Sequence, residues 1–587
     1  MAGRVRARRQ PDLDGIVLNF RWMRVSRALV SADEAPLPEW AQPGNFVFMG
    51  LSGGPLEAEK GLRSGWDGFT HDDPNGNVQA VRDFYRPENI EIPLTASANW
   101  VYVIWSNGWT RERDRAEQWP AAERFVRECR KHGIHVTGYL SAANMFWEDY
   151  LKRKPESRAW IETREPGFLR HYGDSPYRVM AKLSLPAWRS EIKASIDAAL
   201  DAGLEGFWVD NLFPWHGEPL FADFLADLRS HAARRQRGLV WHINVNSGIY
   251  HWGRAGNVLG TEDGRAPTYD PGADPPIQGN QGVLSFISGL TEGWRSAELE
   301  HYGNNLSAET RQLQIAECWS RQVGCAWFPF DRSMRTSLHH RRPAAWKVLE
   351  SMGAYYRHQL KHHEYFQRGE PVAAVGVIGY EGPPEALPGR RQAAYQQGHL
   401  VALLDYLAAW NIQFEVLFED RLRAEVLDTF SLIVVAETDH MPPGAPQALE
   451  SFALRGGRLL VPEGARLASS TALMNLPPAA FLVSRSPALL RDAIRKHISP
   501  PLVEVGHSPP ILSRAVRQKQ RVAVHLLNYA KRPVGPVPVR FHGAASRAEA
   551  IIPELGAAQA LPLRSEGGRT TVTVPEFPIH ALVAFWS

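Results

Sequence analysis

Short apolar runs and helical stretches alternate along the first 365 residues of the chain. The apolar runs, each followed by polar residues, lie at 100–105, 135–140, 206–209, 239–244, 257–260 and 325–330. Between them lie stretches with helical spacing, such as 116–132 and 186–202, each followed by a glycine. The alternation predicts a parallel sheet, and the polar residues after each strand predict a (β/α)₈ TIM barrel over residues 1–365.

The start of this barrel is less clearly marked in the pattern. Gly15–Phe20 is the apolar run nearest the N-terminus and is predicted to be the first strand. Residues 30–95 are rich in Gly and Pro, and we interpret them as an insertion over the barrel mouth.

Two further units follow the barrel. Residues 371–500 alternate short apolar runs with helical stretches, which predicts a compact, doubly wound α/β domain. Residues 511–587 contain no helical pattern, and their alternating runs predict a small antiparallel, sandwich-like β-domain.

Composition excludes several classes of protein. The 66 basic and 63 acidic residues leave a net charge of +3, which argues against nucleic acid or a membrane surface as the partner. No apolar run approaches the roughly 18 residues of a membrane span, and no signal peptide precedes the barrel. The expected location is therefore cytoplasmic. The three cysteines lack metal-site or disulfide spacing, and no cofactor is expected.

Aromatic residues point to the substrate. The chain has 20 Trp, 24 Phe and 16 Tyr, and many lie in the first 330 residues beside Asn, Asp and His. Sugars have apolar ring faces and polar rims, so aromatic rings next to polar side chains suit them. We expect an oligo- or monosaccharide glycoside as the partner, although Trp also fills large cores.

Two carboxylates are the predicted catalytic residues. Asp210 ends the strand Gly206–Val209 and is predicted to be a nucleophile, with an N-cap role as the structural alternative. Glu262 follows the strand at 257–260 and is the predicted general acid/base. Asp263 and Glu292 are the alternative acid/base candidates.

Polar and aromatic residues near other strand ends are predicted to bind substrate, although Asn at such places is also a common turn former. They are Trp105, Asn107, Trp109, Tyr139, Asn144, Asn211, Trp215, His216, His242, Asn244, Asn246, Trp294 and Trp327. No metal site is predicted, because the chain lacks HExxH and closely spaced His pairs on one helix face. The open alternative is a metal shared by His242, Asp263 and Asp210.

The barrel segments resemble hypothetical glycosyl hydrolases related to the family 42 β-galactosidases. The resemblance rests on Pro-Ala-Trp-Arg at 186–189, which leads into Gly-Phe-Trp-Val-Asp-Asn at 206–211. Residues 371–465 resemble the trimerisation domain of those enzymes, which has a glutamine-amidotransferase-like (flavodoxin-like) fold. The shared features there include Gly-His-Leu at 398–400 and Gly-Gly-Arg-Leu-Leu at 456–460. The resemblance implies glycosidase activity and a homotrimer.

The chain departs from that family at strand four. Family 42 enzymes have Asn-Glu there, whereas this chain has Asp210-Asn211, which is closer to the pattern of α-galactosidases, α-fucosidases and family 31 α-glucosidases. Residues 371–587 contain no Cys, so amidotransferase activity is not expected. The leading hypothesis is a retaining glycosidase, with an inverting one left open. The alternatives are a non-catalytic carbohydrate-binding barrel and a metal-dependent hydrolase.

Overall fold

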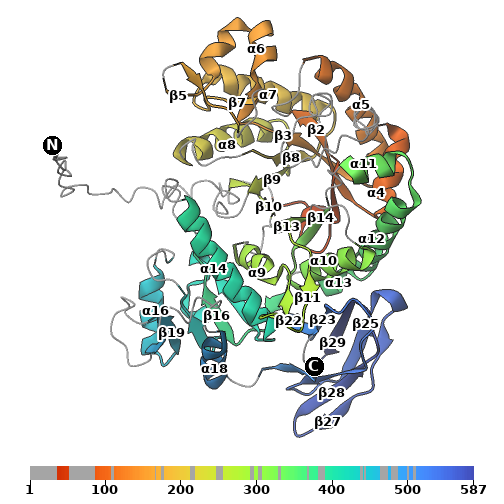
Figure 1. Ribbon diagram of the computed structural model, residues 1–587, viewed down its shortest axis with the longest axis vertical. Coiled ribbons are helices and arrows are strands. Elements are labelled where there is room, and N and C mark those ends of the chain that lie inside the picture. Colours follow the sequence, from red (N-terminus) through yellow and green to blue (C-terminus); the bar gives the residue numbers. More distant parts are fainter. Residues whose placement is uncertain are drawn as a thin grey trace, which may run out of the picture.

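Eight parallel strands close into a barrel in the computed structural model (Figure 1). The strands are β1 Phe48–Leu51, β2 Trp100–Ser106, β3 His135–Leu140, β8 Gly206–Val209, β9 Val240–Val245, β10 Val258–Thr261, β13 Ser296–His301 and β14 Gly324–Trp327. Pairing of β1 with both β2 and β14 closes the sheet. The predicted TIM barrel is therefore confirmed.

The structure describes most of the chain with several gaps. The described residues are 36–51, 86–106, 112–165, 167–172, 178–211, 218–245, 255–262, 264–290, 296–301, 307–327, 332–366, 369–380, 390–436, 441, 444–462, 473–476, 487–498, 501–506 and 510–586.

Helices surround the barrel, as the alternating pattern predicts. They are α4 Glu91–Thr95, α5 Glu112–Lys131, α7 Pro186–Asp201, α8 Glu218–Ala233, α9 Gln281–Leu290, α10 Ala308–Ser320, α11 Arg332–His339, α12 Pro343–Lys361 and α13 His363–Phe366. In α7, Pro186 occupies the first turn, where its missing N–H costs nothing, and Gly203 takes a left-handed φ of 91° just past the end. None of the helices in the described ranges is long and apolar enough to cross a membrane.

Two barrel strands differ from the sequence prediction. Gly15–Phe20 lies outside the described residues, and the strand that opens the closed barrel is β1, within the segment predicted to be an insertion. Among the described residues β1 is thus the first strand of the barrel, and the interpretation of this part of residues 30–95 as an insertion is wrong. The second difference is β13, which no predicted strand covers. It contains Glu298 and Glu300, and two carboxylates in a six-residue strand remove the apolar signal that identifies buried strands.

A small excursion between β3 and α7 adds short elements at the barrel rim. These are β4 Asn144–Phe146, α6 Trp147–Arg153, β5 Thr163–Glu165, β6 Phe168–Leu169 and β7 Arg178–Met180. A second excursion forms the hairpin of β11 Thr268–Tyr269 and β12 Ile277–Gln278.

The second unit is built on a five-stranded parallel sheet in the order β17-β16-β18-β19-β20. Its elements are β16 Val375–Ile378, α14 Arg390–Ala409, β17 Phe414–Leu417, α15 Ala424–Leu427, β18 Leu432–Val434, α16 Ala445–Leu454, β19 Leu459–Pro462, β20 Leu473–Leu476 and α18 Pro487–His497. Figure 1 shows α14 lying beside the barrel helix α9.

The C-terminal unit consists of antiparallel sheets, as predicted. One has six strands: β15 Glu370–Pro371, β22 Ile511–Gln518, β23 Arg521–Asn528, β29 His580–Trp586, β25 Arg547–Ile551 and β26 Gln559–Ala560. The other has four: β21 Val503–Val505, β24 Val537–Phe541, β28 Arg569–Val574 and β27 Arg564–Glu566. Alternate residues of both sheets, such as Val524 and Val539, form one apolar core.

Candidate active site

Asp210 stands one residue past the end of β8, at the rim where the barrel strands end. Its side chain is half-buried. The Tyr139 hydroxyl donates a 2.6 Å hydrogen bond to Asp210 Oδ2, and the Asn244 amide donates a 3.0 Å bond to Oδ1. Tyr139 lies in β3 and Asn244 in β9, the strands on either side of β8. Three neighbouring strand ends thus meet at this carboxylate.

The surroundings of Asp210 act on its pKa in opposite directions. Burial raises the pKa above its ordinary value, while the bonds from Tyr139, Asn211 and Asn244 and the positive charge of Arg178 lower it. Burial and the Asp210 charge together raise the pKa of Tyr139 well above 10.0, so the phenol stays protonated and donates. The donors offset part of the cost of an ionised carboxylate in this partly buried position.

Asn244 joins the two predicted catalytic carboxylates. Its amide nitrogen donates to Asp210 Oδ1 at 3.0 Å and to Glu262 Oε1 at 2.7 Å. Because the two hydrogens of an amide nitrogen diverge by about 120°, the two acceptor oxygens lie on the order of 5 Å apart. Glu262 follows β10, the strand next to β9, and is half-buried like Asp210.

Asn211 supports Asp210 from the side. Its amide nitrogen lies 2.7 Å from the Tyr139 hydroxyl, 3.1 Å from Asp210 Oδ2 and 3.2 Å from Ser141 Oγ. The residue has a left-handed φ of 62°, which Asn tolerates better than most residues. This backbone turn directs the Asp210 and Asn211 side chains into one network.

A buried arginine completes the network and was not among the predicted site residues. Arg178 in β7 is 3% exposed and donates to Asn144 Oδ1 at 2.9 Å and to Ser141 Oγ at 3.4 Å. Its positive charge acts on Asp210. Asn144 is therefore connected to the site through Arg178. The sequence signal for Arg178 is only a basic residue directly before the apolar pair Val179-Met180.

His242 lies deeper in the barrel than the carboxylate pair. It is fully buried, and its Nε2 lies 2.9 Å from Glu298 Oε1 of β13. A Cβ at Gly260, on the strand between them, would collide with both side-chain tips, so this glycine permits their approach. Burial raises the pKa of Glu298 well above its ordinary value and lowers that of His242 well below its own.

Two clusters among the described residues have the atoms to bind a metal ion. In the barrel interior, His242, Glu298 and Glu300 each offer a ligand atom within 4.8 Å of the other two. Outside the barrel wall, His301, Cys318 and Cys325 do the same. All are buried. Neither cluster was predictable from the sequence, because β13, which contributes Glu298, Glu300 and His301, lacks the apolar run of a buried strand.

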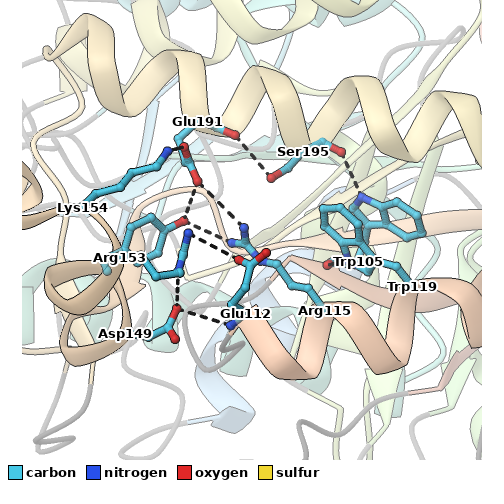
Figure 2. Close-up of polar contacts among 10 residues, drawn as sticks. Trp105, Glu112, Arg115, Trp119, Asp149, Arg153, Lys154, Glu191 and Ser195 are labelled. Atoms are coloured by element: carbon cyan, nitrogen blue, oxygen red, sulfur yellow. Dashed lines mark hydrogen bonds and ion pairs between the residues drawn. The ribbon is translucent and has the colours of Figure 1, made fainter.

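Two predicted substrate-binding tryptophans lie on the outer side of the barrel wall. Figure 2 shows Trp105 stacked on Trp119, with ring centroids 4.8 Å apart, and its indole N–H donating to the Ser195 carbonyl at 2.9 Å. Trp327 lies next to Arg311 of α10. Both tryptophans are buried against helices outside the barrel, so the structure does not bring them to the carboxylate pair.

The excursion at the rim is held by a charged network, also drawn in Figure 2. Glu191 of α7 pairs with Lys154 at 2.5 Å, and Arg115 of α5 donates to the Tyr150 hydroxyl at 3.1 Å. Arg153 of α6 contacts Asp149 at 2.9 Å. These contacts join α5, α6 and α7.

The remaining predicted site residues lie outside the described residues. They are Asn107, Trp109, Trp215, His216, Asn246, Asp263, Glu292 and Trp294.

Comparison with known proteins supports the fold. No protein-family model and no curated protein matches the chain. Among solved structures, α-L-fucosidase isoenzyme 2 from Paenibacillus thiaminolyticus aligns with a TM-score of 0.65 at 12% identity, covering 92% of this chain and all of the other. A β-galactosidase from Rahnella sp. R3 gives 0.56 at 9% identity, covering 94% of this chain and all of the other. A GH42 β-galactosidase from G. stearothermophilus gives 0.59 at 8% identity, covering 92% and 98%. The chain is thus similar in fold, over nearly its full length, to glycoside hydrolases that include GH42 β-galactosidases.

Proposed function

We propose that this protein is a glycoside hydrolase in which Asp210 and Glu262 are the catalytic pair. The observation that carries the proposal is the Asn244 amide, which donates to one oxygen of each carboxylate. In retaining glycosidases the two carboxyl groups are about 5–5.5 Å apart, and in inverting ones about 6.5–9.5 Å. Two oxygens that share one amide nitrogen fit the shorter distance, so we propose retention.

The proposed reaction has two steps. Asp210 Oδ attacks the anomeric carbon while Glu262 gives its proton to the departing glycosidic oxygen, which leaves as an alcohol. Glu262, now ionised, then takes a proton from water, and the resulting hydroxide attacks the same carbon. The bond to Asp210 breaks, the free sugar forms, and both carboxyl groups return to their starting states.

The contacts of Asp210 suit the role of nucleophile. Donors from Tyr139, Asn211 and Asn244 stabilise its ionised form. The same donors would weaken a general acid, which must hold a proton at neutral pH. Glu262 is therefore assigned the proton transfer.

The test is hydrolysis of α- and β-linked aryl glycosides, with α-L-fucosides and β-galactosides included because solved structures with this fold carry those names. We expect Asp210→Asn and Glu262→Gln each to lose at least about 10³-fold, on the order of 4 kcal/mol of transition-state stabilisation. With an aryl glycoside that has a good leaving group, added azide should restore turnover to one of these two variants. Asp149→Asn, at the rim but away from the pair, is the matched control.

Three results would contradict the proposal. If Asp210→Asn keeps wild-type activity, Asp210 is not the nucleophile. If activity is lost with a chelator and returns with a divalent ion, the metal-dependent alternative replaces the two-carboxylate mechanism. Binding of sugar without turnover across a broad panel would favour the non-catalytic barrel.

The supporting units are part of the same proposal. We propose the division into residues 1–365, 371–500 and 511–587, and an amidotransferase-like second unit, which the strand order β17-β16-β18-β19-β20 supports. A homotrimer and a cytoplasmic location stay predictions.

A further inference from the structure

A large cavity lies where the three units meet, away from the Asp210 site. It has a volume of about 1400 Å³ and lies between the barrel helix α9, β17 of the second unit and the turn between β22 and β23. Figure 1 shows α9, β22 and β23 close together below the barrel. The described residues that line it include seven basic and four acidic ones. The excess of positive charge indicates a preference for anions.

Two buried arginines on the cavity wall approach each other around Phe414. Arg321 of the barrel is 5% exposed, and Arg514 of β22 is 6% exposed. The Arg321 guanidinium lies over the Phe414 ring, 4.8 Å from its centroid, and Arg514 donates a 2.5 Å hydrogen bond to the Phe414 carbonyl. Arg321 also donates to Gln281 Oε1 at 2.8 Å. Both of these acceptors are neutral, so neither hydrogen bond pairs a guanidinium group with a negative charge.

No carboxylate of the described residues forms an ion pair with Arg321 or Arg514, although the charges of Asp405 and Glu317 act on Arg321, and that of Glu415 on Arg514, from farther away. None lies within 4.0 Å of either guanidinium, and the nearby Glu415 pairs with Arg421 at 2.8 Å. Arg514 Nε is buried without a hydrogen-bond partner. Burial and the charge of Arg514 lower the pKa of Arg321, and burial lowers that of Arg514 to about 10, so Arg514 stays charged at neutral pH. Two like charges are thus held together at a cost that an anion would offset.

We propose that this cavity binds a small phosphate ester, with the phosphoryl group between Arg321 and Arg514. A phosphate monoester carries a charge near −2 at neutral pH, which matches two guanidinium groups. One guanidinium group can bind two oxygens of a phosphate through two parallel hydrogen bonds. Arg514 Nε is available as a donor for such a bond. The volume also admits an organic portion such as a sugar, because ligand pockets of about 300–1,000 Å³ hold drug-sized molecules.

The test is calorimetric titration and thermal denaturation of the full chain with glucose 6-phosphate, inorganic phosphate, glucose and sodium chloride at matched ionic strength. Glucose 6-phosphate should bind saturably and raise Tm, inorganic phosphate should bind more weakly at the same site, and glucose should have no effect. Arg514→Gln should weaken binding at least about 10-fold. Arg455→Gln is the matched control, because Arg455 is an exposed arginine of the second unit that does not line the cavity and pairs with Asp428 at 2.7 Å.

A second measurement avoids variants that fail to fold. Phenylglyoxal labelling of the wild type, mapped by mass spectrometry, should show that glucose 6-phosphate protects Arg321 and Arg514 but not Arg455, which lies outside the cavity. The proposal is overturned if sodium chloride raises Tm as much as the phosphates do, if Arg514→Gln binds as the wild type does, or if labelling is unchanged. Binding is measured without turnover, so this proposal and the glycosidase proposal fail independently.

Discussion

Asn244 is the residue on which the geometry of the candidate site depends most. Both hydrogens of its amide are donated to carboxylates that belong to different strands, β8 and β10. An aspartate of the same size has no hydrogen to donate and would add a third negative charge. Tyr139 and Asn211 then stabilise Asp210 on its other oxygen. Single side chains thus set both the spacing and the ionisation of the pair.

Tyr139→Phe should move the acidic limb of kcat/KM to higher pH. The hydroxyl donates to Asp210 Oδ2, and its removal takes away a contact that lowers the Asp210 pKa. Because the nucleophile must be ionised, the rate falls as pH falls through that pKa, and a higher pKa moves this loss upward. The measurement is kcat/KM against pH with a cleaved aryl glycoside. Tyr150→Phe, whose hydroxyl accepts from Arg115, is the control. A limb that stays in place would refute the assigned role of Asp210.

At the scale of elements, the site depends on how closely the barrel strands approach one another. A Cβ at Gly206, at the start of β8, would collide with the backbone of Val240 in β9. β8 and β9 carry Asp210 and Asn244, so the spacing of these strands sets the distance between those side chains. The close approach of the β8 and β9 backbones therefore requires glycine at position 206.

Gly206→Ala should therefore destabilise the protein more than a typical glycine substitution. We expect a loss of about 2–3 kcal/mol, because backbone atoms cannot move aside as a flexible side chain can. Gly133→Ala is the control: Gly133 has a φ of 69° with open space around it, so the cost there is about 1–2 kcal/mol of backbone strain. The measurement is the Tm of each variant, obtained from thermal denaturation monitored by circular dichroism, and Gly206→Ala should have the lower Tm. Equal Tm values would show that the β8–β9 spacing tolerates a methyl group.

Much of this element-level picture was predictable, and the exceptions have physical causes. Apolar runs ending in polar residues located β2, β3, β8, β9 and β10, and with them Asp210, Asn244 and Glu262. The orientation of side chains was not predictable, because a barrel strand is buried on both faces and lacks the alternation that separates inside from outside. Trp105 was therefore expected at the site although it faces α7. Arg178 was missed because its strand has three residues.

The barrel and the second unit are joined at the scale of the whole molecule by a close contact between helices. The Gly282 N–H at the start of α9 donates a 2.6 Å hydrogen bond to Asp405 of α14. A Cβ at Gly282 would collide with the Val401 carbonyl of the same helix. The C-terminal unit is bound to the barrel by other contacts, including the 2.6 Å bond from Tyr529 to the buried Glu317.

Asp405 gives this interface a pH dependence that can be measured. Burial raises its pKa to about 7 from an ordinary 3.8. Between those two values the unfolded chain has released the proton while the folded chain keeps it, so stability falls as pH rises through this window. Asp405→Asn should show a smaller fall in Tm from pH 5 to pH 8 than the wild type. Asp428→Asn, an aspartate of the same unit that pairs with Arg455, should behave like the wild type. Identical profiles for all three proteins would remove Asp405 as the cause.

The burial of α9 also determines how far the chain can be shortened. Nearly every residue of this helix is buried, including Val283, Phe286 and Leu290, and the Phe286 ring packs edge-on against Phe418 of the second unit. Truncation at residue 365 would expose this apolar helix to water, and we expect such a fragment to aggregate. Engineering of the barrel therefore has to start from the full-length chain, because α9 has almost no residue that faces solvent.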